Sequence, residues 1–165
     1  MSEQVLARVL DVFSASVQDS HKEHGDETVV IAPSAVVELA RFLRDDSETQ
    51  MEMLIDLTAV DYLGVEEPRF QVVYHFYSLS KNHRLRAKVM LEDESPNVDS
   101  ITSVYKSALW MEREAWDLYG IHFEGHPDLR RILLYPEFEG HPLRKDYPLE
   151  GRQPLIPPRP GQKHL

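Results

Sequence analysis

The sequence contains no cysteine among its 165 residues. This absence excludes disulfide bonds, thiolate nucleophiles, zinc sites built on thiolates and the ordinary cysteine ligation of iron–sulfur clusters. Any redox role of the chain must therefore be indirect.

Long apolar runs are also missing. No uninterrupted apolar stretch approaches the roughly 18 residues that a membrane-spanning helix needs, and the amino terminus has no basic segment followed by an apolar one, as a secretory signal peptide would. The sequence therefore predicts a cytosolic protein that contacts a membrane only through partners.

Positive charge is scarce, since 18 basic and 28 acidic side chains give a formal net charge of -10. Nucleic-acid binding rests on neutralising phosphates, so this balance argues against a nucleic-acid partner. The deficit is uneven: residues 1–68 hold 15 acidic and 4 basic side chains, whereas residues 140–165 hold 2 acidic and 5 basic ones. A locally cationic tail suits docking on an acidic partner surface, and ordinary solvated charge would give the same pattern.

Hydrophobic periodicity predicts two helices and one strand in the first third of the chain. Apolar residues at helical spacing indicate a helix over 4–17, and a second helix is expected to begin with Ser34 as its N-cap and to end near Asp46. Between the two helices lie a predicted polar loop over 18–26 and a short strand over 27–32.

The middle of the chain alternates between apolar and polar residues, which is typical of strands with one buried face. The predicted strands cover 52–59, 70–76 and 84–91, and residues 80–83 are expected to join the last two as a hairpin. One face of the sheet should pack under helices, and the other should be polar and locally basic. In the first strand the residues assigned to the packed face are Met53, Ile55, Leu57 and Ala59.

A third helix is predicted over 99–119, capped by Asp99 or Ser100. Its apolar stripe is interrupted at Glu112, where a carboxylate costs energy unless it is paired.

The last third of the chain is rich in proline, with eight of the eleven prolines between Pro127 and Pro160. Proline removes backbone donors and fixes an extended geometry, which excludes regular helix and central strand. Because this segment also carries apolar side chains, it should lie on its own domain or on another subunit. The prediction is an α+β protein with a two-layer, mainly antiparallel or mixed sheet covered by helices, in which an α+β domain spans 1–119 and an extended docking arm spans 120–165.

The stretch Phe-Glu-Gly-His-Pro occurs twice, at 123–127 and at 138–142. His122 and His126 are four residues apart, as two zinc ligands on a helix would be, but the glycine and proline of the motif oppose a helix there. Acid–base catalysis by carboxylates of the third helix is a second interpretation. The third is a repeated turn that docks the chain, because glycine permits the turn, proline stiffens its exit and basic donors follow each copy.

Residues 107–149, with the sequence SALWMEREAWDLYGIHFEGHPDLRRILLYPEFEGHPLRKDYPL, resemble the signature of the C subunit of NADH-quinone oxidoreductase, respiratory complex I. The likeness runs in order through the Glu-Arg-Glu triplet, the Asp-Leu-Tyr-Gly-Ile run and both copies of the repeat. It covers about a quarter of the chain, and the preceding part follows the family in general pattern.

The resemblance implies a structural subunit in the peripheral arm of a proton-translocating enzyme that passes electrons from NADH to quinone. Members of the family hold no cofactor, while FMN and the iron–sulfur clusters belong to other subunits of the complex. They pack against the D subunit and near the iron–sulfur subunits, on the cytoplasmic side of the bacterial inner membrane. No catalytic, cofactor-binding or metal-binding residue is therefore expected in this chain.

Other assignments stay open at this point. Related membrane-bound hydrogenases and other quinone reductases have equivalent subunits. A free-standing metal-dependent hydrolase built on the histidine repeats, or a soluble adaptor with a cationic tail, are alternatives from other classes.

The expected docking or signature residues fall into three groups. The third helix and its end contribute Glu112, Arg113, Glu114, Asp117 and Gly120. The first repeat and its continuation contribute Gly125, His126, Pro127, Leu129, Arg130 and Arg131. The second repeat and its continuation contribute Gly140, His141, Pro142, Arg144, Lys145, Asp146, Tyr147 and Pro148. The charged side chains of the helix are expected to pair internally or with the D subunit.

Overall fold

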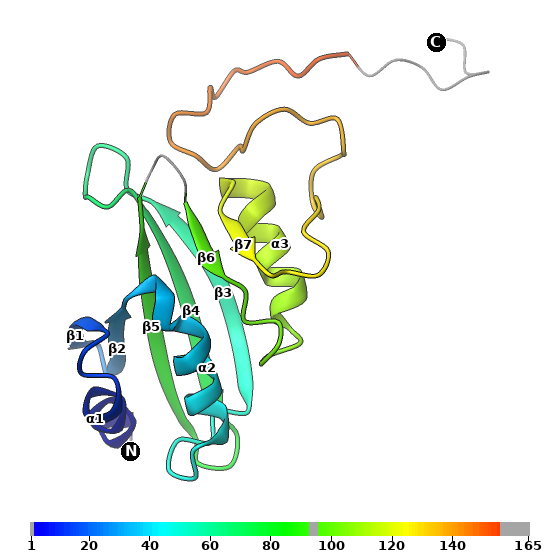
Figure 1. Ribbon diagram of the computed structural model, residues 1–165. Coiled ribbons are helices and arrows are strands. Elements are labelled where there is room, and N and C mark those ends of the chain that lie inside the picture. Colours follow the sequence, from blue (N-terminus) through cyan, green and yellow to red (C-terminus); the bar gives the residue numbers. More distant parts are fainter. Residues whose placement is uncertain (1, 93–95, 156–165) are drawn as a thin grey trace.

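The computed structural model describes residues 2–92 and 96–155 and shows a sheet layer covered by helices (Figure 1). The large sheet has the strand order β1-β2-β5-β4-β3. Its strands are β1 (Val17–Glu23), β2 (Asp26–Ile31), β3 (Met53–Asp61), β4 (Phe70–Ser78) and β5 (His83–Leu91). The α-helices are α1 (Ser2–Val12), α2 (Val36–Asp45) and α3 (Ala108–Tyr119), and β6 (Asn97–Asp99) pairs in parallel with β7 (His122–Glu124).

The large sheet is mixed, because β2 and β5 are parallel whereas its other neighbouring strands are antiparallel. The pairing of Ser78 with His83 closes the predicted hairpin between β4 and β5. The α+β class with a mainly antiparallel or mixed sheet under helices is thus confirmed.

One face of the sheet forms the core with the helices. Leu85 and Val89 of β5 are buried there with Val9 of α1 and Leu39 of α2. On the opposite face of β5, Arg84 is exposed, as the alternation predicts. Figure 1 shows α1 and α2 in front of the sheet and α3 beside it, where α3 packs against β3. No helix in the described residues is both long and apolar enough to cross a membrane.

The predicted polar loop over 18–26 is wrong, since most of it forms β1 and the turn into β2. Within the described residues β1 pairs only with β2, at the edge of the sheet, and its side chains are exposed or half-buried. An edge strand of this kind lacks the apolar alternation by which strands are predicted. Ser34 is not an N-cap either, because a 3-10 turn over Pro33–Ala35 precedes α2.

The third helix is shorter than predicted and begins at Ala108 rather than at residue 99. Residues 97–99 are held instead as β6 by β7, more than twenty residues further along the chain. Ser100 continues this pairing by donating its amide to the carbonyl of Glu124 at 2.8 Å, and Tyr105 donates its hydroxyl to the carbonyl of Met51 at 2.7 Å. These distant partners hold the segment before α3 in turns.

A β-bulge changes which side chains of β3 face the core. The pairing with β4 shifts between Leu54 and Asp56, so Ile55 is an additional residue in its strand. Met53 and Ile55 are consequently 41% and 46% exposed, whereas Leu54 and Leu57 are buried. Placing Met53 and Ile55 on the packed face was therefore wrong, because one inserted residue reverses the alternation on one side of it.

This bulge predicts opposite outcomes for two similar truncations. Leu57→Ala should lower the free energy of unfolding by about 2–5 kcal/mol because it leaves a cavity in the core. Ile55→Ala should stay within about 0.5 kcal/mol because Ile55 is 46% exposed and lies outside the core. Urea unfolding of the full chain measures both, and equal losses would contradict the bulged register.

Candidate functional site

The end of α3 is shaped by Gly120, which has a left-handed backbone conformation with φ of +75° and donates its amide to the carbonyl of Trp116. A Cβ atom at this position would lie 2.6 Å from the ring of His141 and 2.7 Å from Nη2 of Arg144. Glycine therefore both ends the helix and lets the second repeat approach it closely.

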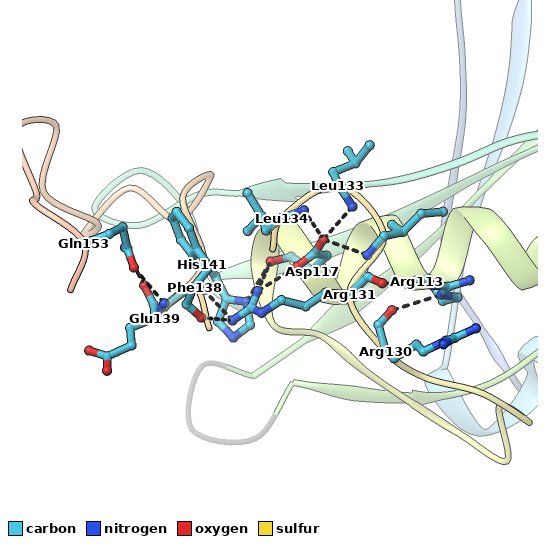
Figure 2. A network of polar contacts seen from close by, with 12 residues as sticks. Arg113, Asp117, Arg130, Arg131, Leu133, Leu134, Phe138, Glu139, His141 and Gln153 are labelled. Carbon is cyan, nitrogen blue, oxygen red and sulfur yellow. Dashed lines mark hydrogen bonds and ion pairs between the residues drawn. The ribbon is translucent and has the colours of Figure 1, made fainter. Parts of the chain in front are cut away.

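Asp117 lies fully buried on the last turn of α3 and binds the chain that follows β7 (Figure 2). Its Oδ1 accepts a hydrogen bond from Nη1 of Arg131 at 2.6 Å. Its Oδ2 accepts the backbone amides of Ile132, Leu133 and Leu134 at 2.9–3.0 Å. Three successive amides and one guanidinium thus converge on a single carboxylate.

The pKa of Asp117 is lowered by this arrangement. Burial alone would raise the pKa, but the hydrogen bonds from the amide of Leu134, from Arg131 and from the other two amides outweigh it. The carboxylate is therefore ionised at neutral pH, and its pairing stabilises the fold above its ordinary pKa.

Arg131 joins Asp117 to the second repeat. Its Nη2 donates to the carbonyls of Phe138 and Gly140 at 2.7 and 3.2 Å. Its guanidinium also lies 5.7 Å from the ring centres of Trp116 and Phe138. The predicted pairing of Asp117 is thus internal to the chain, with Arg131 as the partner.

Arg113 is buried and binds main-chain oxygens. Nε donates to the carbonyl of Arg130 at 2.9 Å and Nη2 to that of Arg131 at 2.8 Å. The guanidinium lies 5.2 Å from the ring centre of Trp110. Arg113 therefore holds the backbone of the segment whose amides Asp117 binds.

The two glutamates of the triplet have different surroundings. Glu112 is fully buried and accepts hydrogen bonds from Oγ of Ser100 at 2.7 Å and from the amide of Ile101 at 2.8 Å, whereas Glu114 is exposed. Burial raises the pKa of Glu112 to about 7, although both hydrogen bonds act in the opposite direction. Glu112 thus ties the turns before α3 to the helix through hydrogen bonds.

A second anchor, which the sequence reasoning missed, holds residues 145 and 146 against the sheet. Asp61 and Arg69 form a buried two-bond ion pair at 2.8 and 2.9 Å. Oδ2 of Asp61 accepts the amide of Lys145 at 2.7 Å, and Nη2 of Arg69 lies 3.0 Å from Oδ1 of Asp146. The bond from Arg69 lowers the pKa of Asp61 to about 2 despite burial.

The sequence offered a partial signal for this anchor. Asp61 ends β3 and Arg69 directly precedes β4, so an antiparallel pairing of these strands would bring them together. No local pattern connects either residue to position 145.

Arg144 adds a third attachment next to this anchor. Its Nε donates to the carbonyl of Tyr119 at 2.6 Å, and its guanidinium lies 5.1 Å from the ring centre of Phe70. Leu143 donates its amide to the carbonyl of Leu118 at 3.1 Å. Residues 128–147, which we call the cradled segment, are therefore attached along their length to α3 and the sheet.

The two histidines of the repeats bind carbonyls of α3. Nε2 of His126 lies 3.2 Å from the carbonyl of Leu109, while its Nδ1 accepts the amide of Asp128. Nδ1 of His141 lies 3.0 Å from the carbonyl of Asp117, and burial lowers the pKa of this ring. The two carbonyls are eight residues apart, which is about 12 Å along a helix, so the rings do not meet at one ion.

The repeats share a turn but differ in their surroundings. Gly125 and Gly140 have φ of +76° and +88°, as the turn interpretation predicts. Phe123 is buried in β7, whereas Phe138 stacks on Tyr147 with ring centres 6.1 Å apart. In the described residues no group of three or more histidines and carboxylates could hold a metal ion.

The remaining expected residues differ in their burial. Leu129 packs against the core, Pro142 is half-buried, and the exposed members are Pro127, Lys145 and Pro148.

Replacing Asp117 by asparagine should release the cradled segment. The change removes a buried charge and leaves Arg131 without its partner, at a cost of about 3–5 kcal/mol. We expect trypsin to cleave the full-length variant faster than the wild type after Arg131 and Arg144, and mass spectrometry of the digest measures both rates. The control Glu114→Gln, on the exposed side of the same helix, should be cleaved at the wild-type rate. Equal cleavage rates for the Asp117→Asn and Glu114→Gln variants would contradict this role of Asp117.

Glu112 should make stability fall as the pH rises. Its pKa is raised from 4.5 to about 7 in the folded chain, so its stabilising contribution is fully present below pH 4.5 and is lost as the pH rises through about 7. Glu112→Gln mimics the protonated acid. The free energy of unfolding of Glu112→Gln should therefore rise by about 2–3 kcal/mol relative to that of the wild type between about pH 5 and pH 8. A difference that does not change with pH in denaturant unfolding would contradict the raised pKa.

Comparison with known proteins places the chain among respiratory subunits. Residues 29–153 match the family described as "Respiratory-chain NADH dehydrogenase, 30 Kd subunit". The C subunit of NADH-quinone oxidoreductase from Geobacter sulfurreducens is 45% identical over 148 residues, which cover 90% of each protein. The corresponding C subunit from Caulobacter vibrioides is 48% identical over 151 residues, covering 92% of this chain and 73% of that protein.

Two solved structures share the fold. The trypsin-resistant fragment (1-134) of Nqo5 has a TM-score of 0.64 and 32% identity, covering 75% of this chain and 98% of the fragment. A chain of the membrane-bound sulfane sulfur reductase, an archaeal respiratory membrane complex, has a TM-score of 0.75 over 90% of this chain and 86% of its own length. Its identity of 20% makes this a likeness of fold alone. With the family match covering most of the sequence, the chain belongs to the family of the 30 kDa subunit, also called the C subunit, of respiratory NADH-quinone oxidoreductase.

Proposed function

We propose that the chain is a structural subunit of the peripheral arm of proton-translocating NADH-quinone oxidoreductase. It docks on the D subunit near the iron–sulfur subunits, and it supports electron transfer from NADH to quinone without holding a cofactor or an active site. FMN and the iron–sulfur clusters belong to its neighbours, through which it is located at the cytoplasmic side of the bacterial inner membrane.

The observation that carries this proposal is the cradled segment, an irregular stretch fixed in one shape by buried charges. Asp117 accepts hydrogen bonds from its backbone amides, and Arg113 and Arg131 donate hydrogen bonds to its backbone carbonyls. Leucines along it and just after it are exposed, namely Leu133, Leu143, Leu149 and Leu155. Single exposed leucines are ordinary, but several along one stretch of chain are typical of a protein interface.

The named relatives favour NADH-quinone oxidoreductase over related membrane complexes. The two relatives from Geobacter and Caulobacter are 45% and 48% identical to this chain, whereas the sulfane sulfur reductase chain is 20% identical. Nqo5 yields a trypsin-resistant fragment that matches 75% of this chain. We therefore expect the globular part of the free chain to resist trypsin and its partner-facing arm to be protected in the complex.

Co-purification from membranes tests the proposal. An affinity-tagged chain should be recovered together with a flavoprotein and iron–sulfur subunits. Recovery as a lone, metal-loaded monomer would contradict the proposal in favour of a hydrolase, and recovery with unrelated soluble proteins would favour an adaptor.

Arg131→Ala should weaken assembly of the complex. It removes charge-assisted hydrogen bonds that shape the cradled segment, each worth about 1.5–3 kcal/mol. Native electrophoresis of membranes should show less assembled complex for Arg131→Ala than for Arg84→Ala, an exposed arginine on the opposite face of the sheet. Normal assembly with lost NADH-quinone turnover would instead indicate a role of Arg131 in the reaction.

A further inference from the structure

A groove of about 470 Å³ lies between α3 and the first part of the cradled segment. Its apolar lining includes Trp116, Leu129 and Leu134, and its cationic lining includes Arg113 and Arg130. Figure 2 shows Arg113 on the helix facing the backbone of Arg130 on the segment. A surface of this composition suits a ligand that is partly apolar and partly anionic.

The charges around the groove do not balance. Arg131 is paired with Asp117, and Arg130 is paired with Asp128 at 2.9 Å. Arg113 is paired with no carboxylate among the described residues, although only 9% of its surface is exposed. A buried guanidinium bound only by carbonyls is unusual, because buried charges are normally compensated by an opposite charge.

Arg113 also keeps an unused donor. Nε and Nη2 bind carbonyls, whereas Nη1 has no hydrogen-bond partner within residues 2–92 and 96–155. Both terminal nitrogens of the exposed Arg130 are likewise without such a partner there. Arginine binds carboxylates through donors of this kind.

An exposed tryptophan lies beside the groove. Trp110 is 61% exposed, and its ring is the one that contacts the guanidinium of Arg113. Tryptophan and arginine are the residues in which the binding energy of protein interfaces is concentrated. The groove thus combines a buried cation and an apolar wall, with an exposed indole beside it.

We infer that this groove docks a segment of another subunit in which a carboxylate pairs with Arg113 and a neighbouring apolar side chain packs against Trp116 and Leu134. The inference rests on the proposed function and specifies the chemistry of the partner segment. Residues 156–165 carry Arg159 and Lys163 and no acidic side chain, so no side chain of that stretch supplies the carboxylate.

Photo-cross-linking in the assembled complex tests this inference. The photoreactive residue p-benzoylphenylalanine replaces Trp110, which contacts Arg113 on the helix beside the groove, or the exposed Pro136, which lines the groove on the segment side. Val65, exposed in the loop between β3 and β4, is the control position. Both groove positions should cross-link one segment of a different subunit, with an Asp or Glu within one helical turn of a large apolar residue.

The pairing itself is tested on the captured segment. Neutralising its carboxylate to Asn or Gln should lower the cross-linking yield at position 110 about tenfold, as loss of a charge-assisted bond implies. An unchanged yield would overturn the pairing with Arg113.

The other outcomes are equally decisive. A cross-link to a lipid, to this chain's own tail or to a segment without a carboxylate would overturn the inference, as would a yield no higher than at Val65. These results would leave the proposed function intact if the chain is still recovered with the flavin and iron–sulfur subunits. Absence of the chain from the complex would contradict the proposed function itself.

Discussion

The buried carboxylate of Asp117 is the contact on which the shape of the last third of the chain depends. A carboxylate in a protein interior is costly, and this one is compensated by a guanidinium and three successive amides. The same hydrogen bonds pair the backbone amides of residues 132–134, which lie in neither a strand nor a helix. The same hydrogen bonds therefore offset the desolvation cost of the Asp117 carboxylate and that of the backbone amides that it binds.

The cradled segment extends this principle, because charged side chains replace the backbone ladder that proline excludes. Arg113, Arg131 and Arg144 bind carbonyls, and Asp61 and Asp117 bind amides. These bonds hold a stretch that has an irregular path. Leu133 and Leu143 of this segment are exposed, whereas Leu129 packs against the core.

The charged side chains of α3 differ in whether an opposite charge lies beside them. Asp117 has a cation and is ionised, whereas Glu112 has only neutral donors and a pKa raised to about 7. Arg113 has carbonyls and an indole but no carboxylate in the described part of the chain. The compensated charges explain how the chain folds, and the uncompensated one is the basis of the proposed docking of a partner segment.

The sequence by itself determined the fold class, the hairpin of β4 and β5, the two glycine turns and the family, because these depend on local alternation, glycine and ordered motifs. It also indicated Glu112 as a buried carboxylate from its place in an apolar stripe. Tertiary structure decided the edge strand β1, the bulge at Ile55 and the start of α3, since pairing with distant segments overrode local pattern. It alone joined Asp61 and Arg69 to positions 145 and 146, because contacts between residues so far apart leave no periodic signal in the sequence.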